Sequence, residues 1–133
     1  MSDEPRPRRI LAVDDDATVL GLLRLLLEAA GYAVATAGSV DEAVAAVATA
    51  PPDLVICDVR LPGAPPFALR DHLAADPATA GLPVLLCSGA LRELAAAAER
   101  PAHGRVATLP KPFDIDELVA TVGRLLAPGA GGG

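Results

Sequence analysis

Six residues that could handle a phosphoryl group each stand at or just beyond the end of a short apolar run. Four are carboxylic acids, one is an alcohol and one is an amine; in chain order they are Asp14, Asp15, Asp16, Asp58, Ser88 and Lys111. Carboxylates a few ångströms apart disfavour each other's ionisation, and a hard divalent cation with oxygen ligands removes that conflict. If the fold brings them together, these acids predict a site for Mg²⁺, or for Mn²⁺ in its place.

Phosphoryl transfer is the reaction that this set of residues suits best. With a divalent cation bound, one aspartate can stay ionised and attack phosphorus, while positioned cations and donors neutralise the charge on the transferred oxygens. The ammonium group of Lys111 and the hydroxyl group of Ser88 are suitable partners for two of those oxygens. Lys111 is the only lysine, since the other ten basic residues are arginines. The compact ammonium group of a lysine suits a tight pocket better than the planar guanidinium group of an arginine does.

Apolar runs alternate with helical patterns along the chain, which predicts five β/α repeats. Strands are expected over residues 9–13, 32–36, 53–57, 83–87 and 105–109. Helices are expected over residues 17–30, 39–49, 67–75, 91–99 and 114–127. Continuous apolar runs are typical of parallel strands that are covered on both faces, and ligands bind such sheets beyond the carboxyl ends of the strands. The candidate residues are therefore expected to converge at that edge.

The helix boundaries carry their own signals. Ser39 and Glu42 have the spacing of a capping box, and Asp114 is placed to cap the last helix. Gly31 is placed to end the first helix. Asp16 is better explained as a helix N-cap than as a metal ligand.

The composition bounds the class of protein. A chain of 133 residues is long enough for one domain, which we place at 9–127 between flexible ends at 1–8 and 128–133. The net charge of −6 and the 2% of aromatic residues argue against a nucleic-acid partner, and no apolar run is long enough for a membrane span. Cys57 and Cys87 indicate buried thiols in a reduced compartment, hence a cytoplasmic protein, although a disulfide between neighbouring strands is conceivable.

Four segments together resemble the receiver domain of bacterial response regulators, the CheY-like family. They are residues 10–16, with the sequence ILAVDDD, 54–63, with LVICDVRLPG, 86–90, with LCSGA, and 111–113, with KPF. The resemblance covers about residues 8–127, and it is specific because the four motifs occur in order. It implies an α/β fold of the flavodoxin type, a (βα)5 three-layer sandwich whose five-stranded parallel sheet has the order 2-1-3-4-5.

The resemblance also implies roles for the acids. Asp58 would accept a phosphoryl group from the phosphohistidine of a histidine kinase in a Mg²⁺-dependent reaction. Asp15 would bind the metal directly, Asp14 through water or by orientation, and the backbone carbonyl group of Arg60 would complete the protein ligands together with Asp58. Such a domain is a phosphoacceptor that assists its own phosphorylation and dephosphorylation, not an enzyme that turns over an external substrate.

Other residues would bind and sense the phosphoryl group. Ser88 would hydrogen-bond it and act as the switch, and Lys111 would pair with one of its oxygens, with a cis bond before Pro112. The chain departs from the family at Thr108, where an aromatic residue is usual. The coupling between the switch serine and that aromatic residue, which is usual in the family, is therefore not expected here in its ordinary form. Arg60 stands where side chains often tune the acyl-phosphate lifetime, by screening water or by pairing with a carboxylate.

Two other functions fit parts of the sequence. Residues 14–18 match the D-x-D-x-T pattern of haloacid dehalogenase-type phosphatases, with Asp14 as nucleophile and Asp16 as general acid, but this leaves Asp58 without a role. A non-phosphorylated interaction module with the same fold is the other alternative. For a receiver, the expected partners are a histidine kinase or phosphotransfer protein and an unknown output protein. We expect a monomer or a weak phosphorylation-dependent dimer, with neither nucleic acid nor membrane bound directly.

Overall fold

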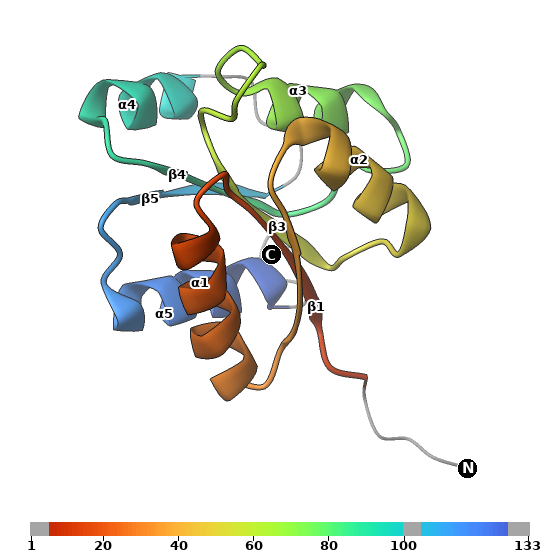
Figure 1. The fold of residues 1–133 in the computed structure, drawn as a ribbon, viewed down its shortest axis with the longest axis vertical. Helices are drawn as coiled ribbons and strands as arrows, with labels where there is room; N and C mark the ends of the chain where they lie inside the picture. Colours follow the sequence, from red (N-terminus) through yellow and green to blue (C-terminus); the bar gives the residue numbers. More distant parts are fainter. Residues whose placement is uncertain (1–5, 100–104, 128–133) are drawn as a thin grey trace.

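The structure is a computed structural model that describes residues 6–99 and 105–127, and within the fourth helix the side chains only as far as residue 97. Within these residues, five strands and five helices alternate (Figure 1). In order they are β1 (Arg9–Val13), α1 (Ala17–Ala29), β2 (Ala33–Ala37), α2 (Val40–Thr49), β3 (Leu54–Asp58), α3 (Ala68–Ala75), β4 (Val84–Ser88), α4 (Leu91–Glu99), β5 (Val106–Pro110) and α5 (Ile115–Leu126). The expected β/α alternation is confirmed.

The five strands form one parallel sheet in the order β2-β1-β3-β4-β5. This is the predicted flavodoxin-like order. Strand β2 is added on one side of β1, and β3, β4 and β5 are added in turn on the other side. The central strands are almost fully buried, whereas β2 at one edge is largely exposed. Where the side of addition changes, the loops after β1 and β3 leave the sheet on opposite sides and open a site between them.

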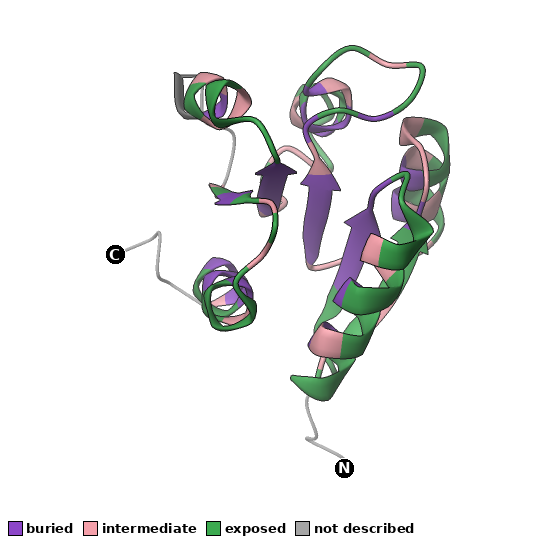
Figure 2. Ribbon diagram, turned by 60° about the vertical axis from the view of Figure 1, so that its left-hand side comes forward, coloured by how far each residue is buried: buried purple, intermediate pink, exposed green. Residues whose placement is uncertain are grey.

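Two apolar layers cover the sheet, one on each face. One contains residues of α2, α3 and α4, such as Val47, Leu73 and Ala97, and the other contains residues of α1 and α5, such as Leu27 and Val122. Figure 2 shows the central strands in the buried colour, with the exposed sides of the helices turned outward. The side chains of each central strand alternate between the two layers, as the two-residue period of a strand requires.

Four of the five strands end one residue later than their apolar runs predict. In β3 and β4 the parallel ladder continues into the first polar residue, so that Asp58 pairs with Cys87 and Ser88 pairs with Pro110. Apolarity alone could not place this boundary, because backbone hydrogen bonds extend a strand whatever its side chain. Asp58 and Ser88 are therefore strand residues, and the sheet fixes their backbones.

Helix starts follow the predicted caps with one change. Asp16 and Asp114 each accept a hydrogen bond from a backbone N–H in the first turn of their helix, and Ser39 Oγ accepts one from the Glu42 N–H at 3.2 Å. The Glu42 carboxylate reaches back one residue further than in a capping box and accepts from the Gly38 N–H at 3.0 Å. The N–H groups of Gly38 and Glu42 are thereby satisfied, in place of the Ser39 and Glu42 pair of a capping box.

The turns around α1 and α3 depend on left-handed backbone conformations. Gly31 ends α1 with φ 99°, as expected for a glycine one residue past the helix cap. Phe67 has φ 66° and precedes α3, so this helix begins at Ala68, one residue later than predicted. Phe67 is 7% exposed and its N–H donates to the Val59 carbonyl oxygen at 2.9 Å, which ties the α3 entrance to the end of β3.

The two cysteines are both buried, but they lie on opposite faces of the sheet. Cys57 belongs to the α2–α4 layer and Cys87 to the α1–α5 layer, and both are free thiols. The idea that they could form a disulfide on neighbouring strands is therefore wrong, because their Cβ atoms point away from each other across the sheet. Burial raises the pKa of the Cys57 thiol to about 12 and raises the pKa of Cys87 as well.

Among the described helices, none is both long enough and apolar enough to cross a membrane. The predicted flexible ends at 1–8 and 128–133 lie mostly outside the described residues.

Candidate functional site

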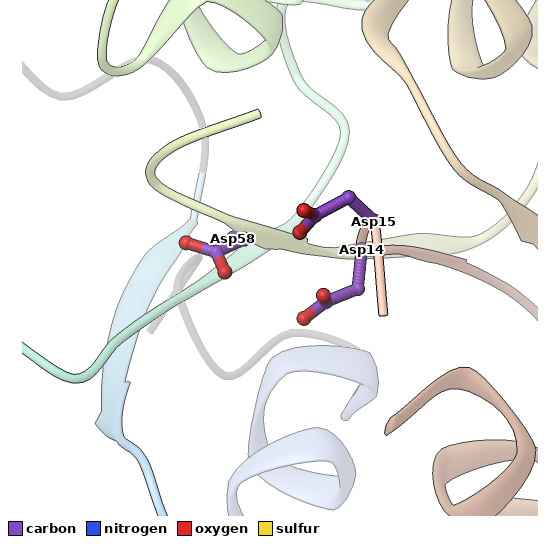
Figure 3. Close-up of side chains that lie close together, drawn as sticks. All are labelled: Asp14, Asp15 and Asp58. Atoms are coloured by element: carbon purple, nitrogen blue, oxygen red, sulfur yellow. The ribbon is translucent and has the colours of Figure 1, made fainter. Parts of the chain in front are cut away.

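Three carboxylates gather where β1 and β3 end. Oxygen atoms of Asp14, Asp15 and Asp58 all lie within 4.8 Å of one another. Figure 3 shows the side chains of Asp14 and Asp15 extending from the end of β1 toward Asp58. The backbone holds this arrangement, because the Asp14 N–H donates to the Ala37 carbonyl oxygen of β2 at 3.1 Å. These three acids therefore lie together at the carboxyl edge of the sheet, as the predicted strand order implied.

The positively charged side chain of Lys111 reaches this cluster from the loop that follows the edge strand β5. Its Nζ donates to Asp14 Oδ2 at 2.6 Å and to Asp58 Oδ2 at 2.7 Å. Its own N–H donates to the Ser88 carbonyl oxygen at 2.9 Å, which anchors the loop after β5 to the end of β4. The Lys111–Pro112 peptide bond is cis, the form that the resemblance implies.

The two ion pairs fix the charge of Lys111. Burial lowers the pKa of this amine, but the hydrogen bonds and the charges of Asp14 and Asp58 outweigh burial and raise the pKa above its ordinary value. Lys111 is therefore an ammonium ion throughout the physiological pH range. Its charge offsets part of the repulsion among the three carboxylates.

The acids differ in their surroundings. Asp14 is 3% exposed, and its second carboxylate oxygen accepts from the Asp16 N–H at 2.9 Å. Asp15 is exposed and Asp58 is half-buried, with its Oδ1 accepting from the Arg60 N–H at 3.0 Å. Asp14 and Asp58 each accept hydrogen bonds on both carboxylate oxygens, but only Asp58 and Asp15 line the opening of the site, whereas Asp14 is buried beneath it.

Asp16 stands apart from this cluster, as its capping role predicts. Its Oδ1 accepts from the N–H groups of Thr18 and Val19, at 2.9 Å and 3.4 Å, at the start of α1. A phosphatase of the dehalogenase type would need Asp14 free to attack and Asp16 free to donate a proton. Here both carboxylates are engaged in structural contacts, so the arrangement does not favour that alternative.

Ser88 is buried at the end of β4 and hydrogen-bonded to a residue that the sequence reasoning missed. Its hydroxyl group donates to Glu93 Oε1 at 2.6 Å and accepts from the Ala90 N–H at 3.0 Å. The other carboxylate oxygen of Glu93 pairs with Arg60 Nε. Arg60 therefore pairs with a carboxylate, one of the two roles expected for it. The signal for Glu93 was its place in the first turn of the helix after Ser88.

A cleft connects these groups to the surface. It runs from the acids past the loop after β3 to the first turn of α4, and its lining consists of Asp15, Asp58, Arg60, Leu61, Pro62, Ser88, Gly89, Ala90 and Glu93. Thr108 lies outside it on β5, where it is exposed and pairs with Leu86 in the ladder. The cleft is thus lined by Asp15, Asp58 and Ser88, and Lys111 is joined to it through its ion pair with Asp58.

The family model of the response regulator receiver domain matches residues 10–123 of the sequence, and the chain belongs to this family. The order of the strands, the acids at the ends of β1 and β3 and the lysine after β5 agree with that assignment. The chain is therefore a two-component receiver, the class of domain that carries a phosphorylatable aspartate.

Relatives and solved structures agree with the family assignment. The chain is 36% identical over 118 residues to the DNA-binding transcriptional regulator NtrC of Salmonella typhimurium, which covers 89% of this chain and 24% of that protein. It is equally similar, at 36% over 118 residues, to the master transcriptional regulator RpaA of Synechocystis, of which it covers 48%. The structure of the chemotaxis response regulator CheY4 of Vibrio cholerae is 28% identical, with a TM-score of 0.78 over 91% of this chain and 100% of that one. The chain thus spans about a quarter and about half of the two transcriptional regulators.

Proposed function

We propose that Asp58 accepts a phosphoryl group from a phosphohistidine and that the acyl phosphate controls an output protein. The observation that carries this proposal is the Lys111 ammonium ion bridging Asp14 and Asp58 within a cluster of three carboxylates. This arrangement provides an accessible nucleophile beside a fixed positive charge, which is what phosphoryl transfer to a carboxylate needs.

The same acids suit a hard divalent cation, Mg²⁺ or Mn²⁺. Asp14, Asp15 and Asp58 would hold it together with the backbone carbonyl group of Arg60, and all of these donors are oxygen atoms. When bound, the cation withdraws charge from the phosphoryl oxygens and from the carboxylates around them.

The transfer itself needs only groups of this chain and the donor. A carboxylate oxygen of Asp58 attacks phosphorus, and the new O–P bond forms as the P–N bond of the phosphohistidine breaks. The imidazole leaves with the electron pair of that bond and takes up a proton from water. Lys111 stabilises one phosphoryl oxygen, and the Ser88 hydroxyl group donates to another once the group is in place.

The partners follow from this chemistry. A histidine kinase or a phosphotransfer protein supplies the phosphoryl group, and an output protein that is still to be identified reads the phosphorylated surface. We place this activity in a domain that spans residues 9–127 of a cytoplasmic protein. It acts as a monomer or as a weak dimer upon phosphorylation, and hydrolysis of its own acyl phosphate resets it.

Labelling with acetyl phosphate and Mg²⁺ tests the proposal, with one added phosphoryl group detected by intact mass. We expect Asp58→Asn to abolish labelling and Asp16→Asn to leave it unchanged, because asparagine caps a helix as well as aspartate does. Asp16→Asn is also the matched control for the phosphatase alternative. Labelling that survives in Asp58→Asn would show that Asp58 is not the acceptor, and labelling that is lost in Asp16→Asn would show that Asp16 does more than cap its helix.

A further inference from the structure

The hydrogen bond between Ser88 and Glu93 has a consequence for the site. The Glu93 carboxylate lies in the same cleft as Asp58, accepts from the Ser88 hydroxyl group at 2.6 Å and pairs with Arg60. We propose that Glu93 competes with the phosphoryl group of Asp58 for Ser88, so that phosphorylation displaces this carboxylate and loosens the first turn of α4. This inference rests on the proposed function and adds a regulatory residue to it.

The competition follows from the chemistry of a hydroxyl group. Serine has one O–H proton to donate, and Glu93 Oε1 at 2.6 Å is a closer acceptor for it than the Ala90 carbonyl oxygen at 3.4 Å. A phosphoryl group bound to Ser88 would need the same proton. It would also bring a second negative charge next to the Glu93 carboxylate, whose side chain is only 14% exposed and therefore weakly screened. One of the two anions has to leave.

Arg60 makes the exchange reversible. Its side chain is 69% exposed, so it is not held by packing, and its guanidinium group can pair with a carboxylate or with a phosphoryl oxygen. In the unphosphorylated protein it pairs with Glu93 and thereby stabilises the carboxylate at Ser88. A phosphoryl group on Asp58, two residues before Arg60, offers this cation a second partner.

The first turn of α4 is the element that responds. The N–H groups of Glu93 and Leu94 both donate to the Ala90 carbonyl oxygen, and the Ala90 N–H donates to Ser88 Oγ. Ser88 and Glu93 are therefore joined to α4 by backbone as well as by side-chain contacts. Loss of the Glu93 contact weakens this turn, which carries Leu91, a side chain that is 80% exposed. The phosphorylation state is thereby transmitted to a surface residue.

Beryllofluoride, a phosphoryl analogue, tests the competition when titrated with Mg²⁺ against the whole chain and followed by calorimetry. Glu93→Gln keeps the size of the side chain and removes its charge. Since hydrogen bonds to charged groups are the stronger ones, we expect this variant to bind beryllofluoride about tenfold more tightly than the unaltered chain. Asp41→Asn, the same loss of charge in the exposed first turn of α2, should not change the affinity.

Hydrogen exchange gives a second readout that does not depend on affinity. In the unaltered chain, beryllofluoride should speed exchange at the Glu93 and Leu94 amides. In Glu93→Gln these amides should exchange faster already without ligand, and ligand should change them little. Equal affinities in the two proteins, with no difference in this turn, would overturn the role of Glu93 and leave the proposed function intact. If the unaltered chain binds no beryllofluoride, both proposals fail.

Discussion

At the scale of the residue, the site consists of three carboxylates that repel one another and one ammonium group, that of Lys111, which offsets part of this repulsion. The Lys111 Nζ lies 2.6 Å from Asp14 Oδ2 and 2.7 Å from Asp58 Oδ2. Asp14 is almost fully buried, so its charge is poorly screened by water. Removing the amine would leave two carboxylates facing each other, and removal of one partner of a buried pair costs more than the pair itself contributes.

Lys111→Met should therefore lower the free energy of unfolding by about 2 kcal/mol in the absence of divalent cations, a figure below that of fully buried pairs because this site is partly open. Millimolar Mg²⁺ should restore part of the loss, since a cation among the same carboxylates replaces the missing charge. Urea denaturation with and without Mg²⁺ measures both effects. The control is Arg24→Met at an exposed pair with Glu28, which should change stability by less than about 0.5 kcal/mol. An equal loss in both variants would contradict this account.

Most members of the site can be predicted from residue types and their order, because acids, a hydroxyl and a lysine follow successive strands. Glu93 could not be predicted in the same way. Its contact with Ser88 depends on how α4 packs after β4, and an acid in a first helical turn is ordinarily explained by the helix dipole. The pairing of Arg60 with this same residue depends on the same packing.

At the scale of the element, each strand positions its last residue by backbone hydrogen bonds, and the helices pack against the sheet by their apolar faces. Helix α5 shows the division clearly. Leu118 is fully buried against the sheet, whereas Ile115, one turn earlier, is 52% exposed. Both are large aliphatic side chains in the same helix, so they form a matched pair for a test of packing.

Leu118→Ala should destabilise the protein by about 3 kcal/mol, because it removes buried methyl groups and leaves a cavity under β5 and β3. Ile115→Ala should cost less than about 1 kcal/mol, since half of that side chain is already in water. Thermal or urea denaturation of the two variants, with acetyl phosphate labelling as a check that the site survives, compares them directly. Similar losses in the two variants would mean that α5 packs otherwise than described.

At the scale of the whole molecule, two apolar layers share one sheet, and each contains one buried thiol. Cys57 faces the α2–α4 layer and Cys87 faces the α1–α5 layer. Burial raises the pKa of Cys57 from 9.0 to about 12, so this thiol stays protonated in the folded state at a pH at which it ionises in the unfolded chain.

The free energy of unfolding should accordingly fall as pH rises above about 9. A group whose pKa is raised by folding contributes its full stabilisation below the pKa of the unfolded state and loses it as pH rises toward the folded value. Between pH 9 and 11, stability should fall less steeply in Cys57→Ala than in the unaltered chain, because the variant lacks this titration. Urea midpoints measured across that range test the expectation, and parallel pH profiles would show that Cys57 does not contribute.

The amino-acid sequence was sufficient to predict the alternation of strands and helices, the parallel sheet and the residues that meet at its carboxyl edge. It could do so because period, caps and apolar runs are local properties, and because parallel strands place their ends at one edge. Three features became visible only in the folded protein: Asp58 and Ser88 end their strands inside the ladder, the two thiols face opposite layers, and Glu93 accepts a hydrogen bond from Ser88. The first two features depend on the register between strands that are distant in the sequence, and the third depends on how α4 packs after β4. No local pattern encodes either.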